Sequence, residues 1–451
     1  MTVSPMDLAR QDLARAVGVS ATVYGYPLIE SMRTCCLQTQ GEALRAPINT
    51  VHHIRHPSTD RDRDVVTPAN DLLYTTAWIN LADGPVRLTV PSAQRHAGRY
   101  FVLALYDAYT ENFDNVGPRN SAAAGETVVL VGPDGLGEHA GDVAGQRVIA
   151  CPTHLVWLIG RIVAGDEADW PAAQALQAEI RLEGLRGAAS RRAPQAVAQW
   201  SGPPVDVMAQ VVEQGADPAA VAPVFYRHLA LALEDAPGRV QDQGMVAWLS
   251  QNGLRLGEAF DWAALDEPVR RGLTEGFAQA LHLIGVSARS RSARPWALAS
   301  RAGRYGSDYL MRALTAYIGL GALATDEAIY GAGHFDVARQ PLDGARSYRM
   351  RFAADGLPPA DAFWSVTLYD AQDRFLYGNS LGRHSIGDRT PGLRYEPDGA
   401  LQIDFSHEPP RDTRNWLPTP PGRFYLIVRI YHPREALHSW QVPALEPVEA
   451  A

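Results

Sequence analysis

A short polar run, Asn70 and Asp71 followed by Tyr74, leads into an apolar stretch and could perform acid–base chemistry. A carboxyl group beside a phenol forms a pair that can remove a proton and return it. We therefore expect Asp71 and Tyr74 to be catalytic and Asn70 to bind the substrate. The alternative is a structural role, because Asn and Asp also cap the turns that precede strands.

A single arginine, Arg429, interrupts the otherwise apolar stretch from Phe424 to Tyr431. By alternation along a strand, Arg429 either faces solvent or is buried and needs a partner. A buried arginine in a β pocket would bind a carboxylate or another anionic group. We expect Arg429 to bind the substrate and Tyr431 to form an aromatic wall beside it.

Two further phrases in the C-terminal part carry polar side chains that could reach the same site. Arg383 could bind an anion, and His384 is expected to be catalytic because histidine titrates near neutral pH. Asn415 and Trp416 follow in a loop, where they would contact the substrate. Their alternative role is to anchor that loop, since an indole N–H and an amide both need hydrogen-bond partners.

The densest histidine cluster, His52, His53 and His56, precedes an acidic and arginine-rich run at Asp60–Asp64. Imidazole and carboxylate groups are the ligands that zinc and iron sites use. A solvated polar loop is the other explanation, because alternating charges of this kind pair with each other. We expect no cofactor, and a metal held by the three histidines is the alternative.

The composition excludes several classes of protein. None of the 41 basic residues is a lysine, so a Schiff base, a Walker A loop and a protein-kinase lysine are excluded. The net charge of −9 gives no support to nucleic-acid binding. No apolar run approaches the roughly 18 residues of a membrane span, and no secretory signal begins the chain, so we expect a cytoplasmic protein. The partner would be a small-molecule substrate, and a homo-oligomer is compatible with the sequence.

One short phrase occurs twice, far apart in the chain. Leu105–Ala108 and Leu368–Ala371 both read Leu-Tyr-Asp-Ala, and each ends an apolar run rich in β-branched and aromatic residues. Such runs predict strands, and the aspartate predicts a turn. The repeat therefore predicts two β domains that share one structural device.

The pattern of the remaining chain predicts the order of the domains. Apolar residues at helical spacing occur near the N-terminus and in the Ala- and Leu-rich middle of the chain. Short strand-like runs punctuated by Gly and Pro predict β-sandwiches. The predicted fold class is mixed β/α and multidomain. The expected parts are an N-terminal helical segment (1–44), a β-sandwich (45–165), a helical domain (166–325) and a second β domain (326–451).

Several phrases carry a resemblance to a known bacterial family. They are Tyr24–Pro27, Pro68–Tyr74, Tyr305–Tyr309, Glu327–Tyr330, Ala362–Asp370, Arg383–Ile386, Asn415–Pro418 and Arg429–Pro433. The chain resembles the proteins that carry domain of unknown function 1254 on the N-terminal side and domain of unknown function 1214 on the C-terminal side. The resemblance implies an N-terminal β-sandwich, a helical middle domain and a C-terminal jelly-roll-like β domain. It implies no particular reaction.

The chain departs from this family's usual pattern in two places. Leu72 stands where the family usually has threonine, and His384 stands where it usually has tyrosine. The first change removes a hydroxyl group and the second adds an imidazole. Either change is expected to mark a member whose substrate differs.

These features predict a cofactor-independent enzyme of hydrolase or lyase type. It would act by acid–base catalysis on a small, partly aromatic or acyl molecule in a cleft between domains, where ligand pockets tend to form. Two alternatives stay open. One is a non-catalytic protein that binds a small ligand, and the other is a metal-dependent enzyme that uses the histidine cluster.

Overall fold

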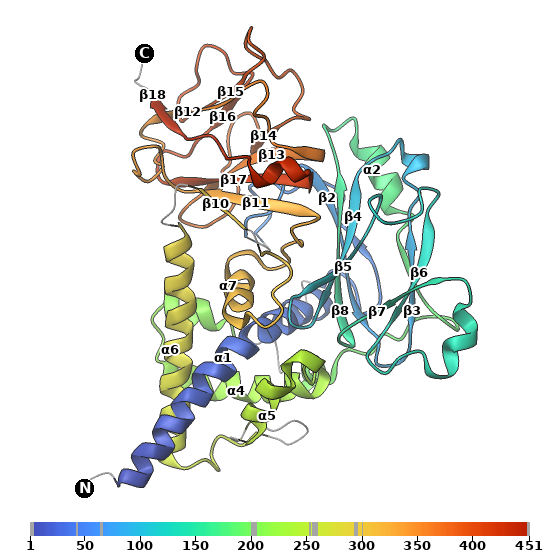
Figure 1. Ribbon diagram of the computed structural model, residues 1–451, viewed down its shortest axis with the longest axis vertical. Coiled ribbons are helices and arrows are strands. Elements are labelled where there is room, and N and C mark those ends of the chain that lie inside the picture. The colour runs from blue at the N-terminus through green and yellow to red at the C-terminus, as the bar shows by residue number, and fades with distance from the viewer. Residues whose placement is uncertain are drawn as a thin grey trace.

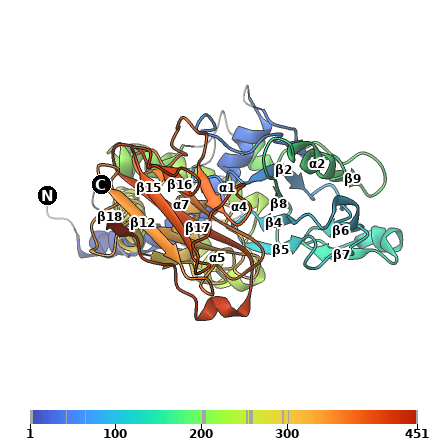
Figure 2. The same ribbon diagram turned by 90° about the horizontal axis from the view of Figure 1, so that it is seen from above.

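The structure is a computed structural model that describes residues 4–41, 44–63, 66–199, 205–251, 254, 260–292, 296–299 and 301–448. Two β-sandwiches and a layer of helices make up the molecule (Figure 1). The C-terminal sandwich lies above the helices in this view, and the N-terminal sandwich lies beside both. Figure 2 shows the two sandwiches side by side from above. This arrangement confirms the predicted fold class.

The helical layer is built around the long first helix. The helices are α1 (Pro5–Thr39), α2 (Trp170–Gln177), α3 (Gln195–Gln199), α4 (Pro218–Asp235), α5 (Gln243–Gln251), α6 (Glu267–Ser292) and α7 (Tyr309–Gly319). Ser4 caps α1 by accepting a hydrogen bond from the Asp7 backbone N–H (3.1 Å). Gly276 of α6 allows α1 to approach closely, because a Cβ there would lie 2.4 Å from the Arg15 carbonyl oxygen. Within the described residues, no helix combines the length and apolar character that crossing a membrane requires.

The N-terminal sandwich consists of two sheets. Its strands are β1 (His52–His53), β2 (Leu72–Asn80), β3 (Val86–Val90), β4 (Phe101–Asp107), β5 (Asn112–Val116), β6 (Glu126–Val131), β7 (Arg147–Ala150), β8 (Leu155–Val163) and β9 (Arg181–Gly184). One sheet has the order β1-β2-β8-β4-β5, and the other has the order β7-β6-β3-β9. Alternate apolar residues of the two sheets form the interior core, among them Leu73, Leu103 and Leu158.

The C-terminal sandwich repeats this topology strand for strand. Its strands are β10 (Trp296–Leu298), β11 (Ala328–Gly333), β12 (Ser347–Phe352), β13 (Ala360–Asp370), β14 (Ser385–Gly387), β15 (Leu401–Ser406), β16 (Trp416–Pro418), β17 (Phe424–Pro433) and β18 (Glu446–Val448). The sheet orders are β10-β11-β17-β13-β14 and β16-β15-β12-β18, which are the N-terminal orders with nine added to every strand number. Even a parallel pair corresponds, β6 with β7 and β15 with β16. The described chain therefore contains the same sandwich twice.

The strand register shows which residues of the two sandwiches correspond. Tyr106 and Tyr369 of the repeated phrase lie near the ends of β4 and β13. Arg161 of β8 lies opposite the β4 residue four positions before Tyr106. Arg429 of β17 lies opposite the β13 residue four positions before Tyr369. Arg161 and Arg429 therefore occupy the same place in the two sandwiches.

The N-terminal sandwich binds the loop in front of β11. Arg161 Nη2 and the Tyr106 hydroxyl both donate hydrogen bonds to the carbonyl oxygen of Gly321, at 2.6 and 2.7 Å. Gly321 has a φ of +79°, which suits glycine, and a Cβ there would lie 2.8 Å from the Ile159 side chain. The loop and the sheet therefore meet too closely to admit a side chain at this position.

The C-terminal sandwich binds the loop in front of β2 in the same way. Arg429 Nη2 donates to the carbonyl oxygen of Thr67 (2.7 Å), and the Tyr369 hydroxyl donates to that of Pro68 (2.5 Å). Thr67 also adopts a left-handed conformation, with a φ of +60°. The two sandwiches are thus joined by reciprocal hydrogen bonds about an approximate two-fold axis, and we call this contact surface the joint.

The joint is continuous with the apolar core beneath the helices. That core combines α1, α4, α6 and α7 with the sheet faces that point away from the sandwich interiors. Trp78 and Trp157 stack there with ring centroids 4.8 Å apart and 7° between the ring planes. The helices therefore hold both sandwiches in one arrangement, and the arginines of the joint lie at the polar edge of an apolar layer.

We expect Tyr369→Phe to destabilise the protein by about 1 kcal/mol, because it loses one buried hydrogen bond across the joint. Tyr106→Phe should cost somewhat more, because it also removes an acceptor of Arg161 (3.3 Å). Thermal unfolding of the two variants beside the wild type measures the effect. Loss of stability in only one of them would show that the two halves of the joint are not equivalent.

Candidate functional site

Asp71 and Glu327 are corresponding acidic residues at the joint. Each immediately precedes the first long strand of its sandwich, β2 or β11. Their carbonyl oxygens accept hydrogen bonds from corresponding backbone groups, the N–H of Ala164 (3.1 Å) and the N–H of His432 (2.8 Å). The two carboxyl groups therefore start from equivalent backbone positions.

Glu327 is fully partnered and only 2% exposed. The Tyr100 hydroxyl donates to its Oε1 (2.6 Å), and Arg119 Nε donates to its Oε2 (2.7 Å). Both donors belong to the N-terminal sandwich, so Glu327 adds an ion pair across the joint. Burial raises the pKa of Tyr100 well above its ordinary value, and the neighbouring Glu327 raises it further, so the hydroxyl stays a donor.

Asp71 has no such donors. Both of its carboxyl oxygens are buried without a hydrogen-bond partner in the described part of the chain, and so is Oδ1 of Asn70. At the register position of Tyr100, the C-terminal sandwich has Phe363, whose ring carries no hydroxyl group. A buried acceptor without a donor is unusual in a folded protein and calls for a specific explanation.

The second missing donor is an arginine. Arg119 corresponds to Arg389, because the turns after β5 and β14 read Gly-Pro-Arg-Asn and Gly-Asp-Arg-Thr at the same register. Arg389 Nη2 lies 4.0 Å from Asp169, and among the described residues it makes no ion pair with Asp71. Asp71 is therefore the position at which the symmetry of the joint breaks down.

Two buried guanidinium groups share the joint with Asp71. Arg161 is 7% exposed and Arg429 is 4% exposed, and their hydrogen bonds go to hydroxyl and carbonyl oxygens. Neither forms an ion pair within the described residues. Burial alone would lower the pKa of Arg429, but Tyr369, other neighbouring tyrosines and Asp71 raise it above its ordinary value, so the side chain stays charged.

Tyr74 and Tyr431 lie near both arginines. Burial alone would lower the pKa of Arg161, but Tyr106, Tyr330 and these two tyrosines raise it well above its ordinary value, and the same two also raise the pKa of Arg429. The Tyr74 hydroxyl accepts a hydrogen bond from the Ala69 backbone N–H (3.1 Å), and its ring centroid is 5.9 Å from Arg161 Cζ. The structure thus brings five of the predicted site residues to one region: Asn70, Asp71, Tyr74, Arg429 and Tyr431.

Arg383, Asn415 and Trp416 hold loops of the C-terminal sandwich. Nη1 of Arg383 donates to three backbone carbonyl oxygens between residues 413 and 416, at 2.6 to 3.2 Å. Asn415 bonds the backbone of a neighbouring loop, and the Trp416 indole donates to the Ser406 carbonyl oxygen (3.0 Å). These contacts favour the loop-anchoring alternative for Asn415 and Trp416.

His384 lies next to the start of β14, at the edge of its sheet. Its Nδ1 is 3.0 Å from the Tyr377 carbonyl oxygen, and burial lowers its pKa below the ordinary histidine value. In the described part of the chain, no hydrogen bond or ion pair joins His384 to Asp71. The structure therefore gives His384 a backbone partner rather than a place beside the unpartnered carboxyl group.

The three histidines of the predicted metal site have separate partners. His53 Nδ1 is 3.0 Å from the Thr75 hydroxyl, and burial lowers the pKa of His53 to about 4. His56 Nδ1 is 3.1 Å from the Pro57 carbonyl oxygen, and His52 neighbours His53 on β1. Across the residues that the structure describes, no group of three or more His, Cys, Asp or Glu side chains is placed to hold a metal ion.

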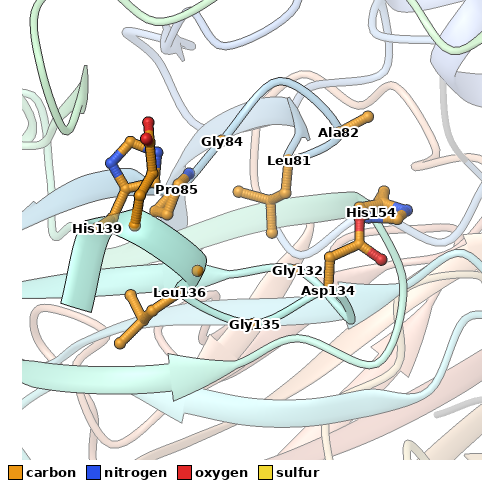
Figure 3. A pocket seen from close by; sticks show the side chains of 12 residues that line it. Leu81, Ala82, Gly84, Pro85, Gly132, Asp134, Gly135, Leu136, His139 and His154 are labelled. Atoms are coloured by element: carbon orange, nitrogen blue, oxygen red, sulfur yellow. Dashed lines mark hydrogen bonds and ion pairs between the residues drawn. The ribbon is translucent and has the colours of Figure 1, made fainter.

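Two surface hollows lie on the N-terminal sandwich. In the smaller one, of about 200 Å³, Asp134 lies beside His154, with Oδ2 and Nε2 2.9 Å apart (Figure 3). Asp134 is 82% exposed, so this pair contributes little to stability. The larger hollow, of about 810 Å³, has His53 and Arg87 in its wall. Neither hollow is lined by Asp71, so the polar cluster of the joint is a separate feature.

The sequence analysis missed Arg161, Glu327 and Tyr100. Arg161 gave the same signal as Arg429, a lone arginine within an apolar strand, β8. Glu327 and Tyr100 both belong to phrases typical of the family, but no site role was predicted for either, because their pairing becomes visible only when the registers of the two sandwiches are compared. The repeated Leu-Tyr-Asp-Ala phrase was the one sequence feature from which that comparison could begin.

Comparison with known proteins identifies the family. Residues 48–184 match the family described as protein of unknown function (DUF1254), and residues 327–435 match protein of unknown function (DUF1214). The chain therefore belongs to the family of proteins that pair these two domains, as the sequence resemblance predicted. A search of curated proteins found no match.

A solved structure shares the fold. The crystal structure of the VPA0106 protein from Vibrio parahaemolyticus has a TM-score of 0.70 and 23% sequence identity, and the match covers 97% of this chain and 100% of that chain. An uncharacterised protein from Burkholderia cenocepacia has a TM-score of 0.46 and 13% identity, over 98% of this chain and 95% of that chain. At 23% identity, the Vibrio structure supports the fold and says nothing of a reaction.

We expect Glu327→Gln to destabilise the protein by about 2 kcal/mol, because it removes the buried carboxylate that Arg119 and Tyr100 bind, while Arg119 keeps the more exposed carboxylate of Asp326 at 3.4 Å. The loss is smaller than for a fully enclosed pair, since the Arg119 side chain is 26% exposed. Asp71→Asn removes no partnered group and should leave the stability unchanged or raise it by about 1 kcal/mol. Denaturant unfolding of both variants checks the contrast, and an equal loss in Asp71→Asn would show that Asp71 is partnered in solution.

Proposed function

We propose that the protein is an acid–base enzyme of hydrolase or lyase type that acts on a small organic anion at the joint. The observation that carries the proposal is the buried, unpartnered carboxyl group of Asp71 beside the charged Arg429. A buried polar group without a partner costs about 1–3 kcal/mol, so its presence asks for a compensating role. Family membership supplies no reaction, and the proposal therefore depends on the site alone.

The unpaired guanidinium groups at the joint favour an anionic ligand. Arg161 and Arg429 are buried positive charges that form no ion pair among the described residues. Of the carboxyl groups near them, Asp388 already accepts a hydrogen bond from the Trp364 backbone N–H (3.2 Å), and the carboxyl group of Asp71 accepts none within the described chain. A carboxylate suits guanidinium groups because both are planar and can form two parallel hydrogen bonds. We therefore assign Arg429 the role of binding the anionic group, with Arg161 contributing to the same positive field.

Asp71 then supplies the acid–base function. Its carboxyl oxygens make no hydrogen bond of their own within the described chain, so they are available to take a proton from the substrate or from a water molecule and to return it. Burial raises the pKa of Tyr431 well above its ordinary value, so its hydroxyl would donate a hydrogen bond and would not act as a base. Tyr74 would hold the loop that carries Asn70 and Asp71 in place through its bond to Ala69.

We expect the wild type to convert a small organic acid and Asp71→Asn to lose this activity. The experiment incubates each protein with a small-molecule extract of bacterial cells and follows every organic acid by mass spectrometry. The matched control is Asp355→Asn, which makes the same chemical change at an exposed turn of the C-terminal sandwich and should convert the acid like the wild type.

Two results would contradict the proposal. Equal conversion by Asp71→Asn and the wild type would remove Asp71 from the chemistry. Retention of an organic acid by the wild type without conversion of any acid would favour the alternative of a non-catalytic binding protein.

A further inference from the structure

We infer that the substrate donates a hydrogen bond from a hydroxyl group to Asp71, in the role that the Tyr100 hydroxyl has against Glu327. The inference rests on the proposed function, because it concerns the same site. It narrows the substrate class to a small organic anion that also carries a hydroxyl group. Glu327 and its donors serve as an internal reference for Asp71.

Glu327 shows which hydrogen-bond donors a carboxyl group at this position has. Glu327 accepts one hydrogen bond from a phenol, Tyr100 Oη at 2.6 Å, and one from a guanidinium, Arg119 Nε at 2.7 Å. In the other copy the ring remains as Phe363, the hydroxyl is gone, and Asp71 is one methylene shorter than Glu327. The two changes together leave the Asp71 carboxyl group without the phenol donor that Glu327 has.

The Phe363 ring is held in its position by the rings around it. The ring is 1% exposed and stacks on Tyr431 with centroids 4.3 Å apart and 13° between the planes. Tyr100 packs against its edge with centroids 5.7 Å apart. A ring fixed on two sides keeps its position, because interiors are close-packed and a shift would open a void elsewhere.

The unpartnered atoms show the kind of group that is missing. Oδ1 of Asn70 and both carboxyl oxygens of Asp71 are acceptors, and Oγ of Ser365, opposite Arg429 on β13, is also buried without a partner. The missing group must therefore donate hydrogen bonds. A hydroxyl group is the donor that the corresponding carboxyl group of Glu327 has, and it adds no charge beside the buried cation of Arg429.

Matched pairs of organic acids on the wild-type protein give the first test. Calorimetry compares lactate with propionate and 4-hydroxybenzoate with benzoate, so that each pair differs by one hydroxyl group. At least one hydroxylated acid should bind at least about tenfold more tightly than its counterpart, because a site built to hydrogen-bond a hydroxyl rejects the analogue that lacks it. Equal affinities within both pairs, or no binding of either hydroxylated acid at millimolar concentration, would overturn the inference.

The variant Phe363→Tyr gives the second test, because it supplies the missing hydroxyl from the protein itself. We expect the unfolding midpoint to rise by about 2 °C, since the new hydroxyl partners Asp71, and the affinity for the hydroxylated acid to fall at least about tenfold. Tyr100→Phe is the mirror-image control and should lower the midpoint, because Glu327 loses a donor. An unchanged midpoint together with unchanged affinity in Phe363→Tyr would overturn the inference.

Failure of this inference can be told apart from failure of the proposed function. If Asp71→Asn abolishes conversion of an acid but the matched acids bind equally, the enzyme proposal stands and hydroxyl recognition is wrong. If Asp71→Asn converts its substrate normally while Phe363→Tyr still blocks a hydroxylated acid, the joint binds hydroxyl groups without acid–base chemistry at Asp71.

Discussion

Two buried arginines that each bond the other sandwich's loop are the constraint on which the rest of the structure depends. Arg161 and Arg429 lie in central strands, on faces that point away from their own sandwich interiors. A buried guanidinium without acceptors is strongly unfavourable, and the acceptors Gly321 and Thr67 belong to loops that lead into the opposite sandwich. Docking of the two sandwiches therefore satisfies both cations at once. The left-handed loop residues and the tyrosines beside the arginines follow from that requirement.

The two copies of the sandwich use the corresponding carboxyl groups differently. At Glu327 the joint uses its carboxyl group for an ion pair and a phenol hydrogen bond, which hold the sandwiches together. At Asp71 the same backbone position carries a carboxyl group with neither partner. If Asp71 acts as we propose, one copy keeps the joint closed while the other bears a group that lowers stability, as is common in active sites.

The sequence predicted the fold class. It also singled out several residues that the structure brings together at the joint, but it did not predict that they lie together. The two Leu-Tyr-Asp-Ala phrases predicted two related β domains, and strand topology now shows how closely related these are. Asp71 and Arg429 were chosen for their residue types alone. Their proximity could not be derived, because it depends on how two sandwiches dock rather than on any local pattern.

Other residues that were predicted for the same chemical reasons do not lie at the joint. Arg383 and Trp416 have the polar groups of a binding site, yet both bond backbone carbonyl groups within their own sandwich. A single sequence does not distinguish an arginine that holds a loop from one that meets a ligand, since both need acceptors. The hydrogen-bond partners in the structure distinguish the two roles. For Asp71 the difference is visible because its counterpart Glu327 has partners that Asp71 lacks.

Reciprocal bonding across the joint has a consequence for synthesis on the ribosome. The loop at Thr67 is translated early, whereas β17, which carries its partner Arg429, is among the last strands to emerge. At about 5–20 residues per second, the N-terminal sandwich waits some tens of seconds with its docking face uncovered. The long helix α1 likewise waits for α6. Asp71 thus acquires its surroundings only after β17 has been translated, and a chain terminated before β17 exposes an unmatched apolar face that quality-control proteases and chaperones can recognise.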